Sequence, residues 1–266
     1  MKQKREQTTS NTKIAVVFIV FLIFIVIISL VVKVIIIIGN GHYNDSRRFT
    51  MSLSDGNNAE LISLSSNLKN ITIFRFKNSI SSSRAGQLLE VPVDGFVVSN
   101  FLNLNQTTSS LFMNLLLNYN KIKTNLTVID LLRLTMFARG VPDMSINSIS
   151  ISNLASIASD NLVGHLMSDD LIEKDDQTIQ IINRTDVIGL GNRLARLITN
   201  MGGNVILVMS EDNSIKNSAI TYIDKKTYTV ERLQEILGYE VVREPSNAMA
   251  DITIIIGEDK LSSLSF

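Results

Sequence analysis

An uninterrupted apolar run near the N-terminus constrains this chain more than any other feature. It extends from Ile14 to Val32 (IAVVFIVFLIFIVIISLVV) and resumes after Lys33 as Val34–Ile38. A helix that crosses a bilayer needs about 20 apolar residues, and this run supplies them. A secretory signal peptide has a shorter core of roughly 7–15 residues and a cleavage site of small residues, which the following IIIIGNGHY does not offer. We therefore predict an uncleaved transmembrane anchor at residues 14–38, with the lipid bilayer as its partner.

Charge is unevenly spread along the chain, although 25 basic and 25 acidic side chains balance overall. Residues 1–38 carry five basic side chains and one acid, and four of the basic ones stand in the tail 1–13. Because Lys and Arg gather on the cytoplasmic side of a span, we expect a cytoplasmic tail at residues 1–13 and an extracytoplasmic body. That body is slightly acidic, which argues against nucleic acid as a partner, because neutralising phosphates needs a clustered basic face.

Residue types that carry chemistry are scarce. The sequence has no cysteine, which excludes disulfides, zinc–thiolate sites and thiol nucleophiles. Its two histidines, His42 and His165, stand in no ligand-like cluster, and no Gly-x-Ser-x-Gly or Ser-x-x-Lys nucleophile motif is present. We therefore predict no catalytic residue, no metal site and no cofactor.

The segment after the anchor is rich in Asn, Ser, Gly and Asp, a composition typical of a spacer. We predict a spacer at residues 39–68, partly ordered near Ala59–Leu64, and we expect Arg47 and Arg48 to lie among lipid headgroups. Residues 153–176 become increasingly acidic, with Glu173 between two Asp pairs, and are predicted to be a helical, acidic linker.

Between these segments we predict a small α/β middle domain at residues 69–152. Alternating or β-branched residues indicate strands at Ile71–Phe76, Gln87–Val91, Phe96–Val98 and from Ile146 to Ile151. Apolar residues at helical spacing indicate helices at Thr108–Tyr119 and Thr127–Arg139. The second helix starts with a capping-box pattern, Thr127-x-x-Asp130, and Gly140 follows its end.

Residues 177–259 have the most regular pattern, and residues 260–266 form a tail. The predicted order begins with strand Thr178–Ile182 and a helix that starts at Leu190 and ends at Gly202-Gly203. Strands Asn204–Met209 and Ser218–Ile223 follow. A second helix starts at Thr229 and ends at Gly238, and strand Asp251–Ile256 comes last, with Tyr239–Arg243 at an edge of the sheet. A β-α-β-β-α-β order is that of a split βαβ, or ferredoxin-like, sandwich. We expect the two middle strands to be antiparallel neighbours, because a polar loop without a helix joins them. The fold class predicted for the whole chain is α+β.

The stretch IQIINRTDVIGLGNRLARLITNMGGNVILV, with the later AITYID, TVERLQEILG and DITIIIGED, resembles the LytR C-terminal domain. Asn183, Thr185, Gly189 and Leu190 are in register with that family's loop between the first strand and helix. The chain departs from the family at Arg184, where Gly is usual, and at Gly191, where Ala is usual. The resemblance implies a bacterial cell-envelope protein, with cell-wall polymer or another envelope protein as partner.

The loop after the first strand is the candidate binding site. Gly189-x-Gly191 lacks the third glycine of a dinucleotide fingerprint, because Leu194 stands there, and no crossover helix joins the second and third strands as a Rossmann half requires. Free N–H groups at a helix N-terminus can still bind an anion. We predict a corner that binds an anion or a partner, formed by Asn183, Arg184, Thr185 and Arg193.

The upstream VPVDGFVVSN resembles a strand of the LytR-CpsA-Psr catalytic domain, which transfers glycopolymers from lipid pyrophosphate carriers to the cell wall. That enzyme family uses arginines and acids around the pyrophosphate, and the arginines of the middle region do not align with such a pattern. Two functions follow. The favoured one is a single-pass envelope protein, not an enzyme, that displays a LytR C-terminal-type module. The alternative is a divergent glycopolymer transferase that acts in cell-wall assembly.

Overall fold

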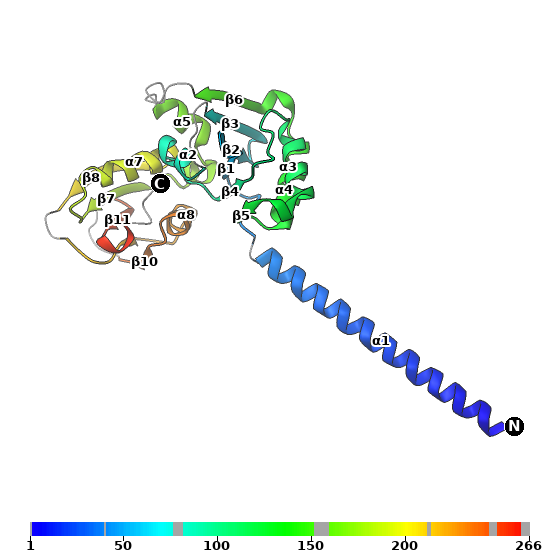
Figure 1. Cartoon of the computed structure of the whole chain (residues 1–266). Coiled ribbons are helices and arrows are strands. Elements are labelled where there is room, and N and C mark those ends of the chain that lie inside the picture. Colours follow the sequence, from blue (N-terminus) through cyan, green and yellow to red (C-terminus); the bar gives the residue numbers. More distant parts are fainter. Residues whose placement is uncertain are drawn as a thin grey trace. The chain divides into compact units, whose positions relative to one another are not determined.

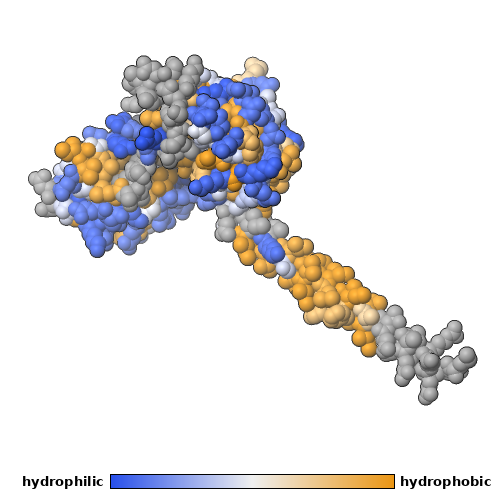
Figure 2. Space-filling view, viewed as in Figure 1, coloured by the Kyte–Doolittle hydropathy of each residue, from blue (hydrophilic) through white to orange (hydrophobic). Residues whose placement is uncertain are grey.

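The computed structural model describes residues 2–39, 41–76, 82–151, 160–211, 214–244 and 249–261. The chain divides into two compact units, residues 1–41 and 42–266. In the first unit a single helix, α1 (Lys2–Gly39), contains the predicted anchor. Its segment Ile14–Lys33 is long and apolar enough to cross a membrane, and its described side chains are exposed along the whole segment (Figure 2).

The second unit contains two separate sheets (Figure 1). The first has six strands in the order β5-β4-β1-β2-β3-β6. Its strands are β1 (Phe49–Ser54), β2 (Ala59–Ser65), β3 (Asn70–Phe76), β4 (Gly95–Val98), β5 (Lys123–Thr124) and β6 (Ile146–Ile151). The pairs β1–β2, β2–β3 and β4–β5 are antiparallel, whereas β1–β4 and β3–β6 are parallel. This is a mixed sheet, which agrees with the α+β class.

The prediction of a spacer at residues 39–68 is wrong. Every residue of β1 and β2 is buried, and the two strands lie at the centre of the sheet. Both strands contain several Ser or Thr residues (FTMSLS, AELISLS), which resembles a linker in composition, but these small hydroxyl side chains are buried. The expectation that Arg47 and Arg48 lie in lipid headgroups is also wrong, because both are bonded within the second unit.

Helices cover both faces of the six-stranded sheet. On one face, α3 (Thr108–Leu117) and α4 (Val128–Arg139) pack on Met51, Leu53 and their neighbours. On the other face, α2 (Ser82–Leu89) and α5 (Asp160–Met167) pack on Leu61 and Phe74. The sheet is therefore the middle of three layers.

The local signals in this region have mixed outcomes. The capping box of α4 is confirmed, and Asp130 also accepts hydrogen bonds from the backbone N–H groups of His42 and Tyr43, both 3.1 Å long. A strand at Gln87–Val91 is wrong, because α2 ends at Leu89 and its apolar residues face the sheet. The prediction of a helical, acidic linker at residues 153–176 is correct about the helices and wrong about the linker for residues 160–176. Helices α5 and α6 (Asp170–Asp175) bury Val163, Met167 and Ile172, and residues 152–159 lie outside the described residues.

The C-terminal sheet has five strands in the order β10-β9-β11-β7-β8. They are β7 (Thr178–Asn183), β8 (Asn204–Ser210), β9 (Ala219–Tyr222), β10 (Glu240–Arg243) and β11 (Ile252–Ile256). Helices α7 (Leu190–Asn200) and α8 (Tyr228–Leu237) contribute to one core with alternate residues of β7 and β11. Glycines with positive φ follow both helices, Gly202 at 94° and Gly238 at 65°, as the sequence predicts.

The predicted element order is confirmed, but the strand arrangement differs from a split βαβ. Strands β7 and β8 are parallel and directly hydrogen-bonded, so α7 makes a simple crossover between neighbouring strands. Strand β11 occupies the other side of β7, where it pairs in parallel with β7 and antiparallel with β9. Strands β8 and β9 are therefore not neighbours. The polar loop between β8 and β9 lets the two strands run in opposite directions, but it does not make them hydrogen-bonded neighbours in the sheet.

Candidate functional site

The predicted corner lies where β7 ends and leads into α7. Asn183 is buried, and its Nδ2 donates to the carbonyl of Val187 at 3.0 Å. Thr185 Oγ1 donates to Asn183 Oδ1 at 2.8 Å, and Val187 N–H donates to Thr185 Oγ1 at 3.3 Å. Both polar side chains thus hold the loop in shape.

The two predicted arginines extend to different partners. Arg184 pairs with Glu211, which follows β8, and each side chain is 31% exposed. Arg193, on α7, lies 3.9 Å from the carboxylate of Glu90, which also pairs with Arg196. The structure therefore brings Asn183 and Thr185 together, whereas Arg184 and Arg193 are directed to separate carboxylates.

The glycines around this loop have different roles. Gly189 is the N-cap of α7 with φ of 81°, and no side chain caps the helix. At Gly191 an added Cβ would lie 3.0 Å from Val208 Cγ1 and 3.6 Å from Asn183 Cβ. Gly191 therefore allows α7 to lie close to the sheet.

Sequence reasoning missed an apolar surface on the same loop. Ile188 is 99% exposed, and Val187, Ile206 and Met209 are also exposed. Met209 pairs with Ile182 at the end of β8, which is an edge strand without a charged residue. Figure 2 shows hydrophobic surface around β8 at this end of the domain. The sequence indicates this surface through Val187 and Ile188, two apolar residues inside the otherwise polar loop NRTDVIG.

The two sheets of the second unit are joined by buried charges. Arg232 of α8 donates through Nη2 to Asp94 Oδ1 at 2.7 Å, and Asp94 Oδ2 accepts from Thr50 N–H at 2.9 Å. Burial alone would lower the pKa of Arg232, but Asp94 and Glu235 beside it raise that pKa above the ordinary value. The guanidinium is therefore a permanent charge with partners in place.

A second arginine, Arg48, lies beside Arg232 at the same joint. Arg48 donates through Nε to the Ser168 carbonyl at 2.7 Å and through Nη1 to the Leu166 carbonyl at 2.9 Å. Asp169 accepts a hydrogen bond from the Tyr228 hydroxyl at 2.6 Å. Burial of the Tyr228 side chain raises its pKa, and the bond to Asp169 raises that pKa further. The cavity between these groups measures only about 10 Å³, room for one water at most. The charges converge, but they leave no space for a ligand.

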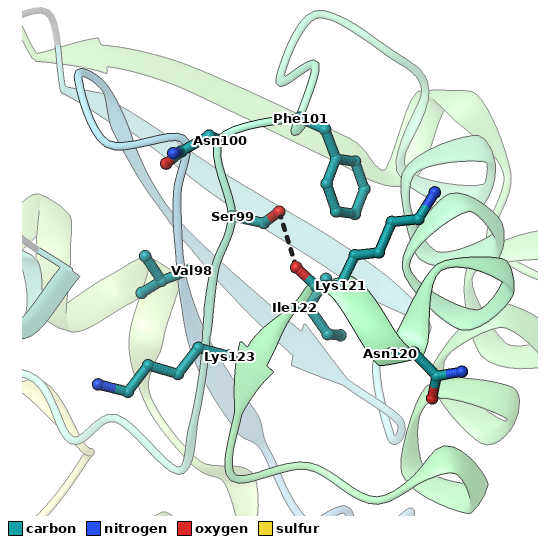
Figure 3. A pocket seen from close by; sticks show the side chains of 8 residues that line it. All are labelled: Val98, Ser99, Asn100, Phe101, Asn120, Lys121, Ile122 and Lys123. Atoms are coloured by element: carbon teal, nitrogen blue, oxygen red, sulfur yellow. Dashed lines mark hydrogen bonds between the residues drawn. The ribbon is translucent and has the colours of Figure 1, made fainter.

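An open groove lies beside the short strand β5. Its volume is about 590 Å³, and it is lined by Val98, Ser99, Asn100, Phe101, Asn120, Lys121, Ile122 and Lys123 (Figure 3). Sequence reasoning placed Val98, Ser99 and Asn100 in the stretch VPVDGFVVSN, but it assigned no binding role to any residue that lines this groove. Among the residues that the structure describes, no three His, Asp or Glu side chains gather as a metal site.

Comparison with known proteins identifies part of the chain. Residues 176–259 match the LytR C-terminal family, described as LytR cell envelope-related transcriptional attenuator. Three solved structures are also similar over part of the chain. The transcriptional regulator yvhJ from Bacillus subtilis is 11% identical over 40% of this chain and 83% of its own, with a TM-score of 0.32. Lin1025 from Listeria innocua is 11% identical over 40% of this chain and 83% of its own, with a TM-score of 0.29. TagV from B. subtilis is 9% identical over 41% of this chain and 85% of its own, with a TM-score of 0.30. TM-scores near 0.3 are too low to decide fold or function. No curated protein matches the chain.

Proposed function

Because residues 176–259 are a LytR C-terminal domain, we propose that the chain is a single-pass protein of the bacterial cell envelope. Its N-terminal tail lies in the cytoplasm, α1 crosses the membrane, and the second unit displays a binding module outside. The partner is cell-wall polymer or another envelope protein. One observation carries the proposal: a helix with a fully exposed apolar span stands in the same chain as a domain of an envelope-related family.

The orientation of the span rests on charge. The tail 1–13 carries Lys2, Lys4, Arg5 and Lys13 against one acid, Glu6. Basic residues stay on the cytoplasmic side of a span during insertion. The second unit therefore lies outside the membrane.

The contact surface of the module is the loop after β7. Asn183 and Thr185 shape it, Arg184 and Arg193 supply positive charge near the uncapped N-terminus of α7, and Ile188 offers apolar area. A partner that carries an acidic group would compete with Glu211 for Arg184, whose side chain is partly exposed.

The proposed role is not enzymatic. A divergent glycopolymer transferase needs convergent arginines and acids with room for a pyrophosphate. The joint between the sheets has the charges, in Arg48, Asp94, Asp169 and Arg232, but each is bonded inside the protein around a cavity of about 10 Å³. At this joint there is no room for a pyrophosphate, and the binding module is the function that we propose.

The test is capture by isolated envelope material. Purified full-length chain in detergent micelles is mixed with isolated cell wall and, separately, immobilised to capture solubilised envelope proteins. We expect retention by one of these materials and a clear loss in the variant Arg184→Gln/Ile188→Ser. The matched control, Lys225→Gln/Val242→Ser, changes an exposed charge and an exposed apolar residue elsewhere in the same domain. A chain that ignores both materials would overturn the proposal.

A further inference from the structure

We propose that the outward face of helix α4 docks on the lipid surface, close to the point where the chain leaves the membrane. The docking face consists of Val128, Leu132 and Met136, which we call the α4 stripe. The inference goes beyond the proposed function and rests on one part of it, the span of α1. It adds a second contact with the bilayer, made by the folded second unit itself.

The α4 stripe is an apolar face that the fold leaves uncovered. Its three residues recur at every fourth position, so they share one side of the helix. Val128 is 43% exposed, Leu132 45% and Met136 66%. Leu131 and Leu134 are buried in the core beneath the helix, which lies on the outside of the six-stranded sheet (Figure 1). Because the solvent side of such a helix normally carries polar residues, the stripe is a candidate contact surface.

The charges around the stripe suit an anionic lipid surface. Arg139 is exposed, and it follows Leu132 by seven positions and Met136 by three, which puts it on the same side of the helix. Arg133 borders the stripe, with a side chain that is 41% exposed. The one acid in the sequence of α4, Asp130, is buried. An apolar face bordered by arginines, without an exposed carboxylate, is typical of a helix that lies in a lipid interface.

The segment that follows the anchor is bonded to this same helix. Asp130 accepts hydrogen bonds of 3.1 Å from the backbone N–H groups of His42 and Tyr43. Arg133 donates to the Tyr43 carbonyl at 3.2 Å, and its Cζ lies 5.5 Å from the centroid of the Tyr43 ring. Arg133 also pairs with Asp45. The chain just past the anchor therefore follows the first half of α4.

Covalent reach limits the distance between α4 and the bilayer. Ile38 is the last residue of the apolar anchor, and His42 comes four residues later. An extended chain covers at most about 3.6 Å per residue, so His42 lies within about 14 Å of Ile38. The headgroup region of one leaflet is roughly 5–8 Å deep. The start of α4, which bonds to His42, is therefore held close to the headgroups.

Docking of the α4 stripe is an intramolecular step once α1 is in the membrane. Three apolar side chains give a free protein only weak attraction to a bilayer, because this attraction grows with the apolar area that is buried. The anchor keeps the stripe at a high effective concentration beside the surface, so even a weak contact is occupied for much of the time. A short stripe is therefore sufficient.

A second copy of the chain suits the stripe less well than lipid does. In a symmetric dimer, the same surface of each copy meets its counterpart. Pairing of two α4 stripes would bring Arg133 and Arg139 of both copies to one interface, without an exposed carboxylate from α4 between them. Like charges across an interface oppose association. Anionic headgroups offer the opposite charge, which favours the lipid surface.

A single tryptophan can report the depth of the stripe, because the chain contains none. Full-length Met136→Trp is reconstituted in vesicles of phosphatidylcholine and phosphatidylglycerol, with part of the phosphatidylcholine brominated on its acyl chains. The matched control is Met249→Trp, at a methionine of the C-terminal domain that is 78% exposed. We expect bromine to quench roughly half or more of the emission of Met136→Trp, and about a tenth or less of that of Met249→Trp.

Removal of a neighbouring side chain tests whether the stripe acts as a unit. In the Met136→Trp background, Leu132→Ser should reduce quenching about threefold. Leu162→Ser is its matched control, at a leucine that is 48% exposed on α5, and should leave quenching unchanged. Arg139→Gln should reduce quenching about twofold in the anionic vesicles and not in vesicles of phosphatidylcholine alone, because the arginine acts through the lipid charge.

Equal quenching of Met136→Trp and Met249→Trp would overturn the docking, as would equal effects of Leu132→Ser and Leu162→Ser. A blue-shifted emission of Met136→Trp that bromine does not quench, and that reverts when the protein is diluted in the vesicles, would show a dimer at the stripe instead of lipid. An alkaline carbonate wash separates this inference from the proposed function. Release of the chain by the wash would contradict the span of α1, whereas a retained chain without quenching overturns the docking alone.

Discussion

Arg232 and Asp94 form a buried ion pair across the joint between the two sheets, with side chains that are 3% and 8% exposed. Arg232 belongs to the LytR C-terminal domain, and Asp94 precedes β4 of the other sheet. Their contact links the C-terminal domain to the six-stranded sheet through two buried charges.

Breaking this pair from one side should strongly destabilise the second unit. Arg232→Met leaves Asp94 buried without its charge partner, which typically costs about 3–5 kcal/mol. Urea unfolding of the full chain in micelles, followed by circular dichroism, measures the loss. The double variant Asp94→Leu/Arg232→Met should recover most of it, and Arg139→Met, at an exposed site, should change stability by less than about 0.5 kcal/mol. A single variant as stable as the unchanged chain would show that the pair does not hold the joint.

Helix α8 is capped by a side chain from another element. Its N-cap residue, Thr227, makes no side-chain cap bond. Asp175 at the end of α6 accepts instead from Thr229 N–H and Thr229 Oγ1, both at 2.8 Å. Asp175→Ala should therefore cost about 1–2 kcal/mol, measured in the same unfolding assay. The exposed Asp224→Ala is the control, and an equal effect of both substitutions would contradict the capping role.

Two glycines should respond to alanine with opposite signs. At Gly257 an added Cβ would lie 2.7 Å from the backbone carbon of Asn217, so the chain must move, and Gly257→Ala should cost about 2 kcal/mol or more. Gly164 stands inside α5, and its Cβ would meet Asn200 Oδ1 at an ordinary 3.5 Å. Gly164→Ala should stabilise by about 0.5–1 kcal/mol through helix propensity. Melting temperatures of the two variants should shift in opposite directions, and a shared sign would refute the packing argument.

Much of this architecture was predictable, because its signals are local. The apolar run, the capping box at Thr127 and the glycines that end α7 and α8 act within a few residues of themselves. The predictions that were wrong concern features that depend on residues far apart in the sequence. The burial of β1 follows from two layers of helices far along the chain, and the position of β11 beside β7 follows from pairing across more than seventy residues.

In the candidate site, too, local contacts were predictable from the sequence and distant contacts were not. Asn183 and Thr185 bond within their own loop, as neighbours in sequence can. The carboxylate partners of Arg184 and Arg193 could not be foreseen, because Glu211 and Glu90 reach them only through the tertiary fold. Val98 and Lys123 line one groove only because β5 pairs with β4, which the sequence does not show.

Asp251 should contribute to the acid side of the stability profile. Thr178 donates to Asp251 Oδ2 through Oγ1 at 2.7 Å and through N–H at 2.9 Å, and these bonds hold the pKa of Asp251 below its ordinary value. A carboxyl with a lowered pKa in the folded state stabilises the fold above its unfolded pKa, and this stability is lost as pH falls through the folded pKa. Since Asp251 is exposed, the effect should be small, about 0.5 kcal/mol.

The measurement for Asp251 is the difference in unfolding free energy between the unchanged chain and Asp251→Asn. We expect the unchanged chain to be more stable at pH 6 and the difference to shrink as the pH falls below the unfolded-state pKa of about 4. A difference that grows on acidification would contradict the assigned direction.

The proposed topology places the second unit outside the membrane, and labelling of single thiols tests this placement. The chain contains no cysteine, so Asp224→Cys in the C-terminal domain and Ser10→Cys before the span each carry one thiol. Intact cells that express either variant are treated with a membrane-impermeant maleimide, before and after lysis. We expect position 224 to be labelled in intact cells and position 10 to be labelled only after lysis, as the proposed topology requires. Labelling of position 10 in intact cells, with position 224 protected until lysis, would contradict it.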